Sequence, residues 1–117
     1  MHTTQIIQLR GDDFDEATRD GLTLVDFWAP WCEPCRMQGA VLDELAVAMG
    51  DSVRVAKVNV DEESELAARF RVSAIPLLVL LKDGWELTRL VGYQQTADIE
   101  RTIKGFKNIW NGHRRLK

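Results

Sequence analysis

The hydrophobic positions of the chain follow two different spacings. Apolar, β-prone runs lie at residues 5–9, 23–28, 52–60, 77–81 and 85–91, and their lengths are typical of strands. In the other segments apolar residues recur every three or four positions, which indicates amphipathic helices. These helices are expected at residues 14–19, at 34–49, after residue 61 and from residue 96. The predicted order is βαβαβαββα.

Acids and glycines mark the expected ends of these helices. Asp12 or Asp13 can cap the first helix, and Gly21 follows its end. Gly50 is the expected stop of the second helix. The last helix should end at residues 111–112, where Asn is followed by Gly. The acidic residues 62–65 provide the third helix with the negative charge that a helix N-terminus prefers.

The arrangement of these elements predicts an α/β fold. The run 23–28 is apolar on both faces except at Asp26, which is typical of a central strand with both faces covered. Asp83-Gly84 between two β-prone runs predicts an antiparallel hairpin. We therefore expect a mixed sheet of about five strands and about four helices in a three-layer α/β/α sandwich.

Three predicted helices have apolar faces that should be buried against the rest of the fold. The second helix has its apolar spacing at Met37, Val41, Leu42 and Leu45, and the third has Leu66, Ala67 and Phe70. In the last helix the corresponding residues are Ile99, Ile103, Phe106 and Trp110.

The composition sets limits on size and function. The 117 residues, 45% of them hydrophobic, support one domain at residues 1–112, followed by a short basic tail at 113–117 to which we assign no role. A net charge of −3 gives no reason to expect nucleic acid or an anionic membrane as a partner. The N-terminus lacks the basic and apolar regions of a secretory signal, so we expect a cytoplasmic protein, with a monomer as the default.

Both cysteines of the chain lie where the second strand meets the second helix. Cys32 is at the start of that helix, where free N–H groups and the helix dipole favour a thiolate. Pro34 suits the first helical turn and stiffens the dipeptide between the two sulfurs. Cys35 lies one turn further in and should be the more buried sulfur, which resolves a mixed disulfide. The pattern favours thiol–disulfide exchange.

Other uses of the two cysteines fit the sequence less well. A zinc site needs further ligands, and His2 and His113 lie at the chain ends, so no metal is expected. A cysteine protease would need a histidine beside Cys32, and no recognisable motif places one there.

Asp26 and Lys57 are charged residues inside apolar runs. Burying a carboxylate without a partner costs several kcal/mol or raises its pKa, so Asp26 indicates a functional purpose. Lys57 interrupts the third strand and also needs a partner. A purely structural Asp–Lys pair is the alternative.

The segment around the cysteines resembles the active-site signature of the thioredoxin family. It reads Val25-Asp-Phe-Trp-Ala-Pro-Trp-Cys-Glu-Pro-Cys-Arg36. Further segments are similar to that family in the same order and at matching spacings: residues 55–61, Ile75-Pro76, 82–84 and Val91-Gly92. The resemblance covers roughly residues 5–110 and implies the thioredoxin fold.

The resemblance also implies a role for each matching residue. Cys32 would be the nucleophile and Cys35 the resolving thiol, with Asp26 as a buried acid that accepts the Cys35 proton through water. Lys57 would be the neighbour of Asp26 on the adjacent strand.

A substrate site is implied beside the cysteines. The Ile75-Pro76 bond would be cis, and the backbone of Ile75 would pair with an extended substrate segment. Trp31, Pro76, Gly92 and Val60 would form the rim of an apolar patch. Trp28 is interpreted as a packing residue under the site, and Trp85 and Trp110 receive no role.

The resemblance implies partners but no bound cofactor. The substrates would be proteins that contain disulfides, and the redox group would be the Cys32–Cys35 disulfide itself. A flavoprotein thioredoxin reductase would restore the dithiol with electrons from NADPH, for which the present chain has no binding fingerprint.

Four residues depart from the family pattern: Glu33, Ala40, Leu77 and Tyr93. Glu33 replaces the usual glycine, and its carboxylate should oppose a Cys32 thiolate by on the order of 1 kcal/mol. A solvated glutamate with a screened charge is the alternative. The departures leave two other functions open: an oxidant or isomerase with a shifted potential, and a binding module whose cysteines are dispensable.

Overall fold

The computed structural model describes the backbone of residues 6–115 and the side chains of residues 6–107. The strands are β1 (Ile7–Gln8), β2 (Leu22–Trp28), β3 (Arg54–Asn59), β4 (Leu77–Lys82) and β5 (Trp85–Val91). The helices are α1 (Phe14–Ala17), α2 (Glu33–Met49), α3 (Ser64–Arg69) and α4 (Thr96–Arg115), with a 3₁₀ turn η1 at Gly50–Ser52. The predicted order of elements is confirmed.

The five strands form one mixed sheet in the order β1-β3-β2-β4-β5. Strands β1, β3 and β2 are parallel, and β4 and β5 are antiparallel to their neighbours. Strand β2 is central, as its apolar faces predict, and every residue from Thr23 to Phe27 is buried. The β4–β5 hairpin is also confirmed.

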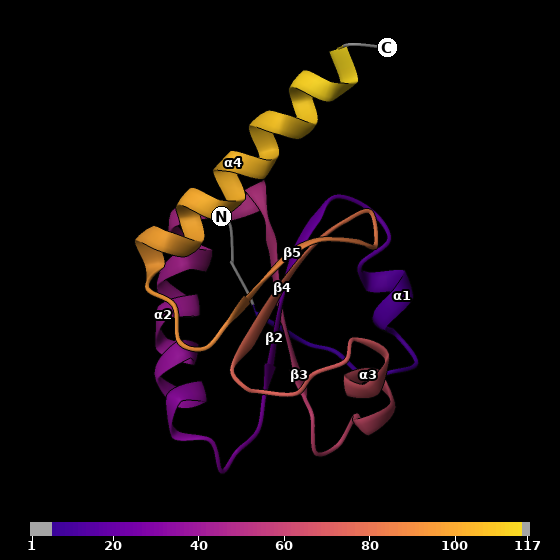
Figure 1. The fold of residues 1–117 in the computed structure, drawn as a ribbon, viewed down its shortest axis with the longest axis vertical. Coiled ribbons are helices and arrows are strands. Elements are labelled where there is room, and N and C mark those ends of the chain that lie inside the picture. Colours follow the sequence, from indigo (N-terminus) through magenta and orange to yellow (C-terminus); the bar gives the residue numbers. More distant parts are fainter. Residues whose placement is uncertain (1–5, 116–117) are drawn as a thin grey trace.

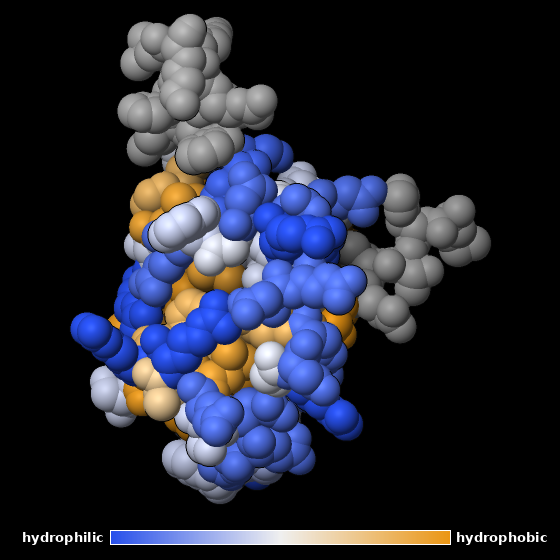
Figure 2. Space-filling view, turned by 90° about the vertical axis from the view of Figure 1, so that its right-hand side faces the viewer, coloured by the Kyte–Doolittle hydropathy of each residue, from blue (hydrophilic) through white to orange (hydrophobic). Residues whose placement is uncertain are grey.

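Helices cover both faces of the sheet (Figure 1). Leu42 and Leu45 of α2 and Ile99 and Ile103 of α4 join one apolar cluster with β2, β3 and β4. On the opposite face Phe14, Leu66 and Phe70 form a second cluster with the same strands. Where α1 and α3 lie, polar and charged residues form most of the surface and apolar residues show between them (Figure 2). The three-layer prediction is confirmed.

Two details of the helices differ from the prediction. Helix α4 continues through residues 111–112 to Arg115, because one interior glycine costs a helix only about 1 kcal/mol. The side chain of Trp110 and the tail residues 116–117 lie outside the described part of the chain. In α2, Met37 is exposed and Gln38 takes the buried position, because Cys35, Gln38, Leu42 and Leu45 share the face that covers the sheet.

The first helix, α1, is shorter than predicted and is capped differently. Helix α1 ends at Ala17, before Gly21, and its N-cap residue Asp13 makes no side-chain capping bond. Instead, Asp13 Oδ1 accepts a hydrogen bond from the N–H of Arg10 at 2.8 Å. The carboxylate therefore stabilises the turn before the helix.

Among the described residues no helix is long and apolar enough to cross a membrane.

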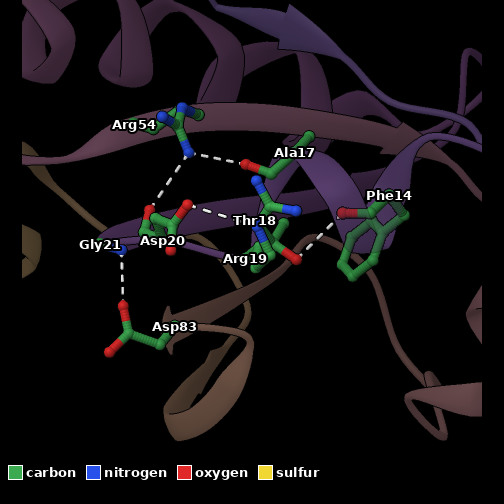
Figure 3. Close-up of polar contacts among 8 residues, drawn as sticks. All are labelled: Phe14, Ala17, Thr18, Arg19, Asp20, Gly21, Arg54 and Asp83. Atoms are coloured by element: carbon green, nitrogen blue, oxygen red, sulfur yellow. Dashed lines mark hydrogen bonds and ion pairs between the residues drawn. The ribbon is translucent and has the colours of Figure 1, made fainter.

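Asp83 connects the hairpin turn to the start of β2. Its Oδ1 accepts a hydrogen bond from the N–H of Gly21 at 2.7 Å, and its own N–H donates to the Gly21 carbonyl at 2.9 Å. Nearby, Arg54 Nη1 donates to the Ala17 carbonyl at 2.6 Å (Figure 3). Asp83 has φ = 51° and Gly84 has φ = 89°, the left-handed conformations that a two-residue hairpin turn requires.

We predict that Asp83→Ala lowers the free energy of unfolding by about 1–2 kcal/mol. The change removes the hydrogen bond from the Gly21 N–H to the Asp83 side chain and places alanine at a positive φ. Asp83→Asn keeps an acceptor oxygen and tolerates this conformation, so it should stay within about 0.5 kcal/mol of the parent protein. Urea unfolding measures both values. Equal stabilities of the Ala and Asn variants would contradict the role of this bond.

Candidate active site

The sheet register brings the predicted site segments to one edge. Trp28 pairs with Asn59 of β3, Phe27 with Leu77 of β4, and Leu77 with Val91 of β5. The segments that leave or enter the sheet beyond these residues therefore meet at the same end. They are the β2–α2 connection with the cysteines, residues 60–61, residues 75–76 and residues 92–94.

Cys32 and Cys35 form a disulfide at the N-terminus of α2. Cys32 is the N-cap residue, and its Sγ accepts a hydrogen bond from the N–H of Cys35 at 3.3 Å. The Cys32 residue is 5% exposed and Cys35 is 2% exposed, so Cys35 is the more buried, as predicted. The donor and the helix dipole both favour negative charge on the Cys32 sulfur when the pair is reduced.

The residues between and under the cysteines have different surroundings. Glu33 and Pro34 are exposed in the first turn of α2, where the missing N–H of Pro34 leaves no intrahelical bond unmade. Trp28 packs against the cluster formed by Ala29 and the two cysteines. The interpretation of Trp28 as a packing residue is confirmed.

Trp31 is exposed beside the disulfide, and its position is fixed by one hydrogen bond. Its Nε1 donates to Asp61 Oδ2 at 3.0 Å. The Asp61 N–H in turn donates to Asn59 Oδ1 at 2.9 Å. From the sequence alone Asp61 is assigned no role at the site, although its position just after β3 is a signal that places it at this edge of the sheet.

The Ile75-Pro76 bond is cis, as the resemblance implied. Ile75 and Val60 pack against the cysteine cluster. The N–H of Gly92 donates to the Pro76 carbonyl at 2.9 Å, and Gly92 has φ = 87°. Pro76 and Gly92 are therefore direct neighbours. The structure brings Val60 and Ile75 to the cysteines and joins Gly92 to Pro76.

Asp26 is 0% exposed in β2. Alternate side chains of a strand share a face, so Asp26 lies on the same face as Leu24 and Trp28, which α2 covers. Neither carboxylate oxygen has a hydrogen-bond partner among the described residues. Burial raises the pKa of Asp26 to about 7, and the positive charge of Lys57 limits the increase.

Lys57 lies directly opposite Asp26 in the β2–β3 register. Its Nζ is 4.8 Å from the centroid of the Trp28 ring, a cation–π contact. A Cβ atom added at Gly39 of α2 would be 3.5 Å from the same Nζ. The ammonium group therefore lies between β2 and α2, next to both the acid and the packing residue beneath the cysteines.

These features define a site for thiol–disulfide exchange. A cysteine pair forms a disulfide at a helix N-terminus, and a buried acid with a pKa of about 7 lies under the same helix. Among the described residues no group of three or more His, Cys, Asp or Glu side chains lies close enough to hold a metal ion. An acid with that pKa can take up or release a proton near neutral pH.

Comparison with known proteins agrees with this chemistry. The thioredoxin family model matches residues 5–105. The chain is 39% identical to the thioredoxin of Bacillus subtilis (strain 168) over 98 residues, which cover 84% of this chain and 94% of that protein. It is 47% identical to the thioredoxin of Alicyclobacillus acidocaldarius over 92 residues, 78% of this chain and 88% of that protein.

The chain therefore belongs to the thioredoxin family. It is a thiol–disulfide oxidoreductase that reduces protein disulfides, and its cysteine pair forms the redox-active disulfide of the family. No bound cofactor is needed for this activity.

We predict that Asp26→Asn changes how stability depends on pH. The pKa of Asp26 is about 7 in the folded protein and has the ordinary value of 3.8 in the unfolded chain. Between these two pH values the native state therefore holds a proton that the unfolded chain has lost. The Asp26 contribution to stability is thus present below about pH 4 and is lost as the pH rises through 7. Relative to the parent protein, the variant should gain roughly 4 kcal/mol between pH 4 and pH 8.

Urea unfolding at several pH values measures this gain. Asp12→Asn, at an exposed acid, is the matched control and should follow the parent protein. A pH dependence of Asp26→Asn identical to that of the parent would contradict the assignment of the shifted pKa.

Proposed function

We propose that Cys32 is the attacking thiol of this oxidoreductase. The observation that carries the proposal is its position as N-cap of α2, with the Cys35 N–H directed at its sulfur. The Cys32 thiolate attacks one sulfur of a substrate disulfide. A Cys32–substrate disulfide forms, the substrate S–S bond breaks, and the first substrate thiolate leaves and takes up a proton from solvent.

Cys35 completes the reaction as the resolving thiol. Its thiolate attacks Cys32 Sγ, which forms the Cys32–Cys35 disulfide and releases the second substrate thiolate. Asp26 accepts the Cys35 proton through water, and the pKa of about 7 suits this role. Lys57 is the partner that keeps the pKa of Asp26 within this range. The substrate gains two electrons and two protons, and the cysteine pair loses them.

The substrate lies across the apolar segments beside the disulfide. Trp31 is exposed there, and Val60 and Ile75 pack on the cysteine cluster. The backbone of Ile75 pairs with an extended segment of the substrate, in the manner of strand addition. Pro76 and Gly92, joined by a hydrogen bond, form the adjacent part of the same surface.

A thioredoxin reductase returns the disulfide to the dithiol with electrons from NADPH, so the protein takes part in electron transport. The support for this step is membership of the family. We further propose that the protein acts in the cytoplasm, since a reducing compartment keeps such a cysteine pair in the dithiol form. We also propose that it is a monomer with a single domain at residues 1–112. The basic residues 113–117 have no assigned role.

Single cysteine variants test the division of roles. Reduced Cys35→Ser should accumulate a mixed disulfide with insulin, detectable on a non-reducing gel, because the resolving thiol is absent. Cys32→Ser should trap nothing, and both variants should lose turnover to the level of the uncatalysed dithiol reaction. Equal trapping by Cys32→Ser would reverse the assignment. Full activity of the Cys32→Ser/Cys35→Ser double variant in cells would identify a binding module.

Glu33 and Pro34 are proposed to tune the cysteine pair. We predict that Glu33→Gly lowers the pKa of the Cys32 thiol by less than about one pH unit, because a nearby negative charge opposes the thiolate. Ultraviolet thiolate absorbance of the reduced protein follows the titration. Glu33→Gln, which removes the charge without adding backbone freedom, should lower the pKa in the same direction. An unchanged or raised pKa would refute the effect.

A further inference from the structure

Gln38 is a fully buried polar residue on the sheet-facing side of α2. It is 0% exposed and follows Cys35 by three residues, so the two side chains leave the helix on the same side. The next residues on this face, Leu42 and Leu45, are apolar. A buried amide costs free energy unless its donor and its acceptor are both satisfied, so Gln38 must have a hydrogen-bond partner for each.

Both ends of the Gln38 amide bind the backbone of one residue. Nε2 donates to the Gln94 carbonyl at 2.9 Å, and Oε1 accepts from the Gln94 N–H at 2.8 Å. Only one orientation of the amide satisfies both bonds. Gln38 therefore holds Gln94 as a neighbouring strand would, by a donor and an acceptor together.

Gln94 belongs to the segment between β5 and α4. Its side chain turns back and donates to the carbonyls of Val91 at 3.2 Å and Gly92 at 3.4 Å. At the other end of the segment, the Gly92 N–H binds the Pro76 carbonyl. A continuous set of hydrogen bonds thus joins α2, through residues 91–94, to the cis-proline segment.

This segment presents apolar side chains to solvent next to the site. Val91 and Tyr93 are both exposed large hydrophobic residues. Tyr93 is also one of the departures from the family pattern. The hydrogen bonds of Gln38 fix the backbone directly after Tyr93, and so they restrict where the two apolar side chains can lie.

We propose that Gln38 is a positioning residue for protein substrates, which holds residues 91–94 in the conformation that receives an extended substrate segment. The inference rests on the proposed function, because it assumes that substrates lie across Pro76 and Gly92. Gln38 acts on substrate affinity and leaves the sulfur chemistry unchanged. A small disulfide that reaches Cys32 without using residues 91–94 should not depend on it.

Kinetics of Gln38→Met test the proposal, because methionine fills similar space without the two hydrogen bonds. For insulin reduction we expect KM to rise about fivefold, with kcat within about twofold of the parent protein. Reduction of the small disulfide dithiobis-nitrobenzoate, and the potential of the cysteine pair, should stay unchanged.

Thr96→Val is the matched control. This variant removes a different hydrogen bond of α2, the one that Thr96 Oγ1 at the start of α4 donates to Glu44 Oε1 at 2.7 Å. It leaves residues 91–94 untouched. Its KM for insulin should equal that of the parent protein. A fivefold rise in this control would assign the effect to loss of helix contacts in general and overturn the role of Gln38.

The outcomes separate this inference from the proposed function. If the parent protein reduces neither disulfide, the proposed function fails and the inference fails with it. If the parent reduces both, an unchanged insulin KM in Gln38→Met overturns the inference alone. An equal loss of activity toward insulin and the small disulfide also overturns it, because Gln38 would then affect the cysteines.

Amide hydrogen exchange gives a second test that does not depend on a variant. In the parent protein the Gln94 N–H should exchange at least about tenfold more slowly than exposed loop amides, because Gln38 Oε1 accepts its hydrogen bond. Exchange of Gln94 as fast as that of an exposed loop amide would overturn the proposed contact.

Discussion

Strand β2 is hydrogen-bonded along both edges, and this constraint determines the geometry of the site. It pairs with β3 on one side and β4 on the other, and its apolar side chains are buried on both faces, so both faces must be covered. Helix α2 covers one face directly after β2 ends, so its N-terminus lies at the carboxyl end of the central strand. Cys32 and Cys35 are located at that point because the chain must turn there from strand to helix.

The same packing explains the unusual acid. Asp26 lies on the face of β2 that α2 covers, so the helix that carries the cysteines also removes Asp26 from water. The pKa of about 7 follows from that burial, partly offset by Lys57. One packing arrangement thus supplies both the thiol pair at a helix N-terminus and a nearby group that exchanges protons at neutral pH.

The sequence predicted the order of strands and helices, the central strand and the hairpin because strong local patterns specify them. These patterns depend only on neighbouring residues. They are the spacing of apolar and polar residues, the Asp83-Gly84 turn and the change from strand to helix at Cys32. The end of α4 was predicted wrongly because Asn-Gly weakens a helix without stopping it. The burial of Met37 was predicted wrongly because a polar residue, Gln38, occupies the buried face of α2, and only the tertiary contact with Gln94 satisfies its amide there.

The contacts of Asp61 and Gln38 had no local signal of comparable strength. Asp61 binds Trp31 across 30 residues and Gln38 binds Gln94 across 56 residues. Such pairs depend on the final register of the sheet. The cysteine pair was recognisable from a short motif, whereas the contacts of Asp61 with Trp31 and of Gln38 with Gln94 required the tertiary structure.

Cys32 and Cys35 can donate electrons to protein disulfides only if the pair is sufficiently reducing. The most direct measurement is the equilibrium potential of this pair, titrated against a thiol–disulfide buffer with tryptophan fluorescence as the readout, since Trp28 packs on the cysteines. We expect a potential more reducing than roughly −230 mV. A less reducing value, or no reversible disulfide at all, would contradict electron donation by this pair.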